Sequence, residues 1–343
     1  MYKYMFLFLS LVCYHSVGQS YFNYYKIVNT AENHILKLNF DSSLHFYKQA
    51  FRLNYAFGKD YYNASICALK TNNKKLCREY LLELANKGLN FEYLKSKLIF
   101  NSILNKKVFN NSYKAKYDAF FRKNQDIRNT LDSLVIADQY LRKKIDFYQN
   151  PDLYKKEVRV IDSSNAKSLL KLINKIGCFP NESIVGLGDS LTSSPLFDLI
   201  IWHQGDKTKQ SFNFANILEN AIMKGEILPD RASLLIQLND GKKNFQNDIV
   251  YKVNFLDDSL LSSDEFRKNN QWLYKIWALK KKGLNELRYS MGLCSISEYV
   301  AKVKYTLFNN EPFVFFSQVT FPTYQVNDLE SAKQLLKNGT ILR

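Results

Sequence analysis

The sequence predicts a mainly α-helical protein with at most a small strand element. Only 12 Gly and 6 Pro occur in 343 residues, which indicates few tight turns and favours helices over a many-stranded sandwich. Hydrophobic residues make up 46% of the chain and aromatic residues 15%, enough to build a core. Through most of the chain, apolar residues recur at steps of three and four, as on one face of a helix.

The first 18 residues are predicted to be a signal peptide. Lys3 supplies a positive charge, residues 5–12 form an apolar run too short to span a bilayer, and Ser16-Val17-Gly18 places small residues before a cleavage site at Gln19. We therefore expect an exported protein, periplasmic, secreted or at the cell surface, with no transmembrane segment after removal of the signal. A core helix is the alternative interpretation of this run.

Residues 19–112 are predicted to form paired antiparallel helices. The expected helices cover residues 24–38, a stretch capped by Asp41, residues 59–69 and residues 74–86, and Gly88 ends the last of them. The pairing, Ala50 and Ala64 where helices approach, and a period of about thirty-four residues make this segment similar to tetratricopeptide repeats. Such repeats build concave surfaces, so the resemblance implies a protein or peptide partner.

A connecting helix, or two, is expected over residues 113–150, ended by Asn150-Pro151. Residues 151–310 are predicted to form a second helical domain, with Ser295 and Glu298 as a capping box. Its expected helices are 166–176 after the caps Asp162-Ser163-Ser164, 196–203, 214–222, one starting at Pro229, and 296–307. Residues 311–343 are predicted to contain one strand, Phe313–Phe321, and a last helix from Asp328 to Gly339; the partner of the strand is left open.

Four cysteines follow the predicted signal peptide. Cys67 and Cys77 lie across an expected helix hairpin and could form a disulfide in an oxidising compartment. Buried free thiols are the favoured alternative, because a domain of this size needs no covalent staple. The spacing of the cysteines suits no zinc site.

The net charge of +16 raises the question of nucleic acid. The lysines occur singly or in short runs such as Arg142-Lys143-Lys144, without a continuous stripe. This pattern disfavours nucleic acid as a partner. Contact with nucleic acid or an anionic surface would show an affinity that falls steeply with salt.

The segment Gly186-Leu187-Gly188-Asp189-Ser190 is similar to the first block of the GDSL hydrolases, whose nucleophile is the Ser after Gly-Asp. A serine hydroxyl needs a base to take its proton. That family draws the base from a C-terminal Asp-x-x-His, and no His follows His203 in this chain. A glycine-rich turn with a capping Asp-Ser is therefore the favoured interpretation.

Several short motifs of the second half follow one another in a fixed order. They are Gly177-Cys178-Phe179-Pro180 with Val185-Gly186, Trp202-His203, Asp230-Arg231, and Asn285 to Leu293. In this order they resemble an uncharacterised bacterial family, a domain of unknown function, with Gly-Trp-Pro…Val-Gly, Gln-His-Ala-Asp, Asp-Arg and Arg…Gly-Leu motifs. Here Trp202 replaces the Gln, and the acid after the His is displaced to Asp206.

This resemblance implies a polar cluster of His203, Asp206, Asp230, Arg231 and Arg288. His203 could act as a base oriented by Asp206 or Asp230, and Arg231 and Arg288 could hold an anion. The alternative is that His203 is a structural histidine and Asp230-Arg231 a buried structural pair. His203 and Asp206 are too few ligands for a metal, and no cofactor is expected.

Two functions follow as hypotheses. The first is an exported helical-repeat protein that binds a protein or peptide or serves as a scaffold. The alternative is a hydrolase-like enzyme or an anion-binding domain that uses the polar cluster around His203. The sequence leaves the oligomeric state open.

Overall fold

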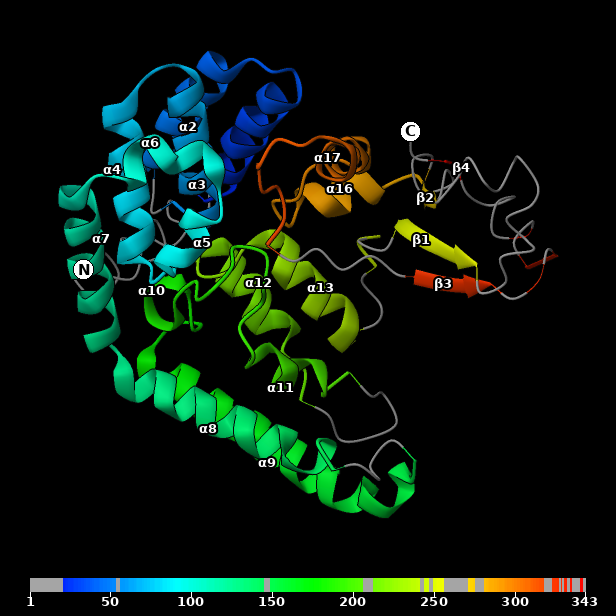
Figure 1. Ribbon diagram of the computed structural model, residues 1–343. Helices are drawn as coiled ribbons and strands as arrows, with labels where there is room; N and C mark the ends of the chain where they lie inside the picture. Colours follow the sequence, from blue (N-terminus) through cyan, green and yellow to red (C-terminus); the bar gives the residue numbers. More distant parts are fainter. Residues whose placement is uncertain are drawn as a thin grey trace, which may run out of the picture.

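The computed structural model describes residues 21–53, 56–144, 149–205, 212–240, 244–246, 249–255, 271–274, 281–317, 323–326, 328, 330–331, 334 and 340–341. The predicted signal peptide and Asp206 lie outside these residues. The fold is mainly α-helical, which confirms the predicted class (Figure 1). Over the described residues, no helix has the length and apolar character needed to cross a membrane.

The first half is built from short helices that pack in pairs. After a helix over residues 21–36, the elements are α2 (Phe40–Leu53), α3 (Gly58–Lys70), α4 (Lys74–Asn86), α5 (Phe91–Lys95), η1 (Leu98–Phe100), α6 (Asn101–Leu104) and α7 (Lys107–Arg122). The side chain of Asn73 caps α4 by accepting from Leu76 N, so α4 begins where the sequence predicts. The cap of α2 is Asn39 rather than Asp41, since Asn39 Oδ1 accepts from Ser42 N.

Two long helices, α8 (Gln125–Arg142) and α9 (Pro151–Ile176), lie side by side along one edge of the molecule (Figure 1). The predicted connecting segment contains two helices, α7 and α8, which is one of the two predicted alternatives, and the break between them falls at Asn124, whose φ is +58°. The predicted start of the next helix, after the caps Asp162-Ser163-Ser164, is wrong. Proline is favoured at the first helical position, so α9 already begins at Pro151 and continues through Asp162-Ser163-Ser164.

The remaining helices match most of the predicted ranges. They are α10 (Glu182–Val185), α11 (Asp198–Trp202), α12 (Ala215–Met223), α13 (Pro229–Asp240), α16 (Leu284–Tyr289) and α17 (Ile296–Phe308). The predicted capping box is confirmed, because Ser295 and Glu298 bond to each other's backbone amides at the start of α17.

A small sheet lies at the end of the molecule away from the first-half helices (Figure 1). Its strands are β1 (Val250–Phe255), β2 (Gln271–Tyr274), β3 (Thr323–Val326) and β4 (Thr340–Ile341), in the order β3-β1-β2-β4. The β1 strand pairs antiparallel with β2 and parallel with β3. The predicted strand at Phe313–Phe321 is wrong for its described residues 313–317, which belong to no strand.

This segment instead packs as an extended chain against the first-half helices. The side chain of Asn63 on α3 donates to Val314 O at 2.7 Å and accepts from Val314 N at 2.9 Å. The ring of Phe313 stacks on Phe40 at 5.9 Å. One amide side chain thus supplies both hydrogen bonds that a neighbouring strand would have given.

One hydrophobic core runs through both halves of the chain. Tyr25 of the first helix donates from its hydroxyl to Ile222 O on α12 at 3.0 Å, and Glu298 on α17 accepts from Asn33. Cys67 and Cys77 are buried in this core as free thiols, and burial raises the pKa of each to about 12. The favoured prediction of free thiols is confirmed.

Candidate functional site

His203 lies at the C-terminal end of α11 and contacts the long helix α8. Its Nδ1 is 2.9 Å from Oδ1 of Asp138, which is almost fully buried. Arg142 approaches the same Asp138 oxygen at 3.3 Å and donates from Nη2 to both oxygens of Asp162 at 2.8 and 2.9 Å. His203 is therefore one member of a network that joins α8, α9 and α11.

The positive and negative side chains of this network neutralise one another. Burial alone would raise the pKa of Asp138, but the hydrogen bond with His203 and the charges of His203 and Arg142 hold that pKa below its ordinary value. Asp138, Asp162 and His203 also offer ligand atoms within 4.8 Å of one another. The guanidinium of Arg142 already binds both carboxylates, so it supplies the positive charge that a metal ion would bring. The arrangement favours a structural network.

Asp230 and Arg231 are neighbours on α13 with different partners. Arg231 donates from Nε and Nη2 to the two oxygens of Asp198 at 2.7 and 2.6 Å. Its guanidinium lies 5.8 Å from the ring centre of Phe179 and 5.4 Å from that of Phe197. Asp230 Oδ2 accepts from the backbone N and hydroxyl of Ser317 at 2.6 and 2.8 Å. Successive helix positions face different sides, which separates the pair.

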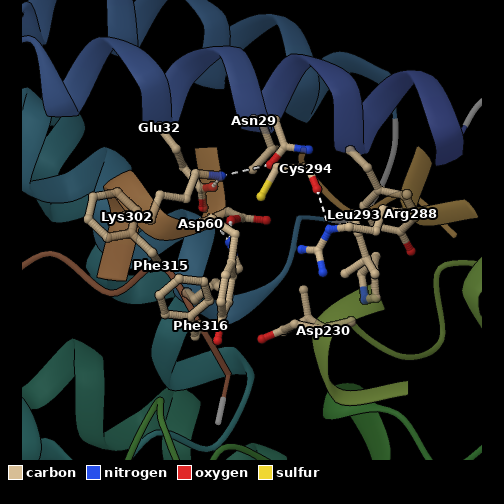
Figure 2. Close-up of a pocket in the computed structure, with 17 residues that line it drawn as sticks. Asn29, Glu32, Asp60, Asp230, Arg288, Leu293, Cys294, Lys302, Phe315 and Phe316 are labelled. Carbon is tan, nitrogen blue, oxygen red and sulfur yellow. Dashed lines mark hydrogen bonds and ion pairs between the residues drawn. The ribbon is translucent and has the colours of Figure 1, made fainter. Parts of the chain in front are cut away.

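Arg288 is fully buried and bonds to backbone carbonyls. Its Nε donates to Cys294 O at 2.8 Å and its Nη1 to Phe245 O at 2.6 Å. Figure 2 shows its guanidinium in the same cavity as the Asp230 carboxylate. Asp230 and Arg288 thus share a cavity, Arg231 lines a second pocket, and His203 lines none of the pockets described here. The implied cluster does not converge, and the roles of its members in binding or catalysis stay predictions.

The cavity of Figure 2 is dominated by charged groups that sequence reasoning missed. Lys302 Nζ lies 2.5 Å from Glu32, and Lys59 Nζ lies 2.6 Å from Glu32 and 2.9 Å from Asp60. Tyr24 donates from its hydroxyl to Asp60 at 2.5 Å. The residues come from the first helix, α3 and α17, so no local motif marks them. The cavity volume is about 60 Å³, which leaves room for water but not for a substrate.

The two buried lysines decide the ionisation of Glu32. Burial alone would raise the pKa of Glu32, but the charges of Lys302 and Lys59 outweigh it and hold the pKa below its ordinary value. Burial alone would lower the pKa of Lys59, but Asp60 and Glu32 raise it. The cluster therefore binds α3 and α17 to the first helix as a charged unit.

The Gly-Leu-Gly-Asp-Ser segment forms a turn that is anchored to the first half. Leu187 N donates to Lys87 O at 2.9 Å, and Asn90 N donates to Gly188 O at 2.8 Å. Ser190 Oγ accepts from Thr192 N at 3.1 Å, a local turn contact. None of the described histidines lines the adjoining pocket, so none of them can serve there as the base for a serine nucleophile. The geometry agrees with the interpretation as a glycine-rich turn.

A groove of about 450 Å³ lies between α2 and α4 on the face of the first half. Its floor is an aromatic cluster in which Phe51 lies 4.8 Å from Tyr61 and 5.4 Å from Tyr80, measured between ring centres. Lys48 and Arg52 of α2 line the groove, as do Glu79 and Glu83 of α4. Phe51, Tyr61 and Tyr80 lie on three different helices, so no local sequence pattern marks this cluster.

Comparisons with known proteins give no assignment. The chain matches no family model, no curated protein and no solved structure. The resemblances to the domain of unknown function and to tetratricopeptide repeats therefore stay predictions.

Replacing His203 with alanine is expected to lower the free energy of unfolding by about 1–3 kcal/mol, because Asp138 loses a hydrogen bond and a small cavity forms. Urea unfolding of the variant measures the loss. The matched control is His45→Ala, since His45 is exposed and its hydrogen bond and ring contact, among the described residues, are with Gln49 in the next turn and with the edge of Phe46. Equal stability of the two variants would contradict a structural role for His203.

Proposed function

We propose that this protein is an exported helical-repeat protein that binds an amphipathic helical segment of a partner protein in the groove between α2 and α4. The main observation behind the proposal is that the aromatic floor of the groove lies between basic residues of α2 and acidic residues of α4. Grooves of this kind receive the apolar face of a helix.

The floor offers both apolar surface and hydroxyl groups. Phe51 and Tyr61 are half-buried, and Tyr80 is 9% exposed. Burial raises the pKa of Tyr61 and of Tyr80 to about 12, so both hydroxyls are neutral at physiological pH. Tyrosines with an apolar body and a polar tip are favoured in binding interfaces.

The charged residues along the two sides of the groove determine which charges the partner helix should carry. Lys48 and Arg52 are one helical turn apart on α2, and Glu79 and Glu83 are one turn apart on α4. A helix with acidic residues along one side of its apolar stripe and basic residues along the other would satisfy both borders. A partner with only acidic or only basic flanks would meet repulsion at one of them.

A hydrolase-like activity has weaker support. Ser190 is bonded within its own turn, and His203 is held by Asp138 in another environment. The groove borders also argue against nucleic acid at this face, because Glu79 and Glu83 would repel phosphates.

The test uses designed, fluorescently labelled 18-residue helical peptides with a leucine stripe. Their flanks are mixed, all acidic or all basic. We expect the mixed peptide to bind best by fluorescence anisotropy. The double variant Lys48→Glu/Arg52→Glu should weaken the mixed peptide about tenfold, roughly 1.4 kcal/mol, and should now prefer the all-basic peptide.

The matched control is Lys167→Glu/Lys171→Glu, which makes the same charge change on exposed residues one turn apart on α9. An unchanged preference in Lys48→Glu/Arg52→Glu would contradict the proposal. A two-fold dimer would also set the basic border of one copy against the acidic border of the other. If the wild type is a dimer and Lys48→Glu/Arg52→Glu dissociates it, the groove serves self-association and the peptide proposal is overturned.

A further inference from the structure

A second pocket, of about 510 Å³, lies where the two halves of the chain meet. Helix α8 contributes Asp132, the glycine-rich turn contributes Asp189, the segment after that turn contributes Ser194, and α13 contributes Arg231. The volume falls within the usual range for small-molecule sites, and such sites are common where parts of a fold meet.

Arg231 is fixed in this pocket with part of its guanidinium uncommitted. Asp198 takes Nε and Nη2, and the rings of Phe179 and Phe197 pack near the guanidinium. Over the described residues, Nη1 makes no hydrogen bond, although the residue is only 6% exposed. A guanidinium oriented by a carboxylate on one edge presents its other edge for a ligand carboxylate.

Ser194 adds a second unsatisfied group. Its hydroxyl oxygen is buried and has no hydrogen-bond partner within the described part of the chain. An unpaired buried hydroxyl costs free energy, so a ligand acceptor or donor at this position would stabilise the protein.

The exposed end of the pocket has the opposite charge. Asp132 and Asp189 are exposed, which places them toward solvent, whereas Arg231 is buried. Within the described part of the chain, Asp132 has no hydrogen bond or ion pair, and Asp189 accepts a hydrogen bond only from the side-chain amide of Asn90. Arg128 of the same wall donates to the carbonyls of Ile184 and Phe121.

We propose that this pocket binds a small zwitterion, an amino acid or a short peptide. Its carboxylate accepts from Nη1 of Arg231 and from the hydroxyl of Ser194, and its ammonium group faces Asp132 and Asp189. A simple anion fits less well, because the carboxylates at the exposed end would repel it. The site is separate from the groove between α2 and α4, and the inference does not depend on that groove.

The test is calorimetric titration of the full-length protein with alanine, glutamate, lysine, dialanine and trialanine, alongside their N-acetylated and C-amidated forms. We expect at least one free zwitterion to bind, and both of its capped forms to bind at least tenfold more weakly. If none of the zwitterions binds, or if a capped form binds as well as the free form, the proposal is overturned.

Two variants test how the ligand is oriented in the pocket and leave the Arg231–Asp198 ion pair unchanged. Asp132→Asn should weaken the free zwitterion at least fivefold and leave the N-acetylated form unchanged. Ser194→Ala should weaken the free form and leave the C-amidated form unchanged. Asp118→Asn, an exposed residue of α7 that does not line the pocket, is the control and should bind as the wild type does. If Asp132→Asn also binds as the wild type does, the proposed orientation is wrong.

Discussion

Replacing Glu32 with glutamine is expected to lower the free energy of unfolding by about 3–5 kcal/mol. Glu32 is 2% exposed and neutralises Lys302 and Lys59, which are themselves buried. After the substitution, Asp60 is the only carboxylate among the described residues left in contact with Lys59, and Lys302 loses its acidic partner Glu32. Thermal or urea unfolding measures the change.

The control for this prediction is Glu311→Gln. Glu311 pairs with Lys70 at 2.6 Å, a geometry like that of the buried pairs, but both side chains are about 30% exposed. Water screens this pair, so its loss should cost less than about 1 kcal/mol. Similar losses in the two variants would mean that the buried lysines are not held by Glu32.

The difference in free energy of unfolding between the wild type and Glu32→Gln should also depend on pH. The pKa of Glu32 is lower in the folded protein than in the unfolded chain, so its ionisation contributes stability above the ordinary carboxyl pKa. That contribution disappears as the pH falls through the folded pKa. The gap between wild type and Glu32→Gln should therefore be full at neutral pH and shrink below about pH 4.

Local chemistry explains what the sequence could predict. The start of α4 at Asn73 and the start of α17 at Ser295 depend on side chains within three residues of the helix end. Asp328 likewise accepts from the N and Oγ of Ser331, as a helix cap does. Signals of this range are visible in a single sequence.

Partners distant in the sequence explain what it could not predict. The short apolar run from Phe313 to Phe316 suits a buried strand, but Asn63 on α3 supplies the backbone hydrogen bonds instead. An extended segment that packs on helices and a buried strand in a sheet can have the same short run of apolar residues. Only the tertiary position of Asn63 distinguishes them.

The networks around His203 and Glu32 also depend on partners distant in the sequence, and only Asp138 gives a local sign of its network. Asp138 occupies an otherwise apolar face of its helix, and an acid at such a position needs a partner. That observation alone could have suggested an ion pair with a basic residue. It could not have identified His203, which is 65 residues away in the chain.

The second large effect is expected for Asp198→Ala, which should lower the free energy of unfolding by about 3–5 kcal/mol. The substitution leaves the guanidinium of Arg231 buried near Phe179 and Phe197 without its acidic partner. Urea unfolding of the single variant gives the magnitude.

The double variant Asp198→Ala/Arg231→Met tests the physical reason. Removing the stranded charge and filling its place with an apolar side chain should restore part of the stability, so the double variant should be more stable than Asp198→Ala alone. A double variant less stable than Asp198→Ala would show that Arg231 contributes through packing more than through its charge. If the double variant is the more stable one, the unpaired buried charge of Arg231 accounts for most of the stability lost in Asp198→Ala. The Asp198–Arg231 pair is then best understood as holding an arginine at a pocket between the two halves of the chain, where its free edge can meet a ligand.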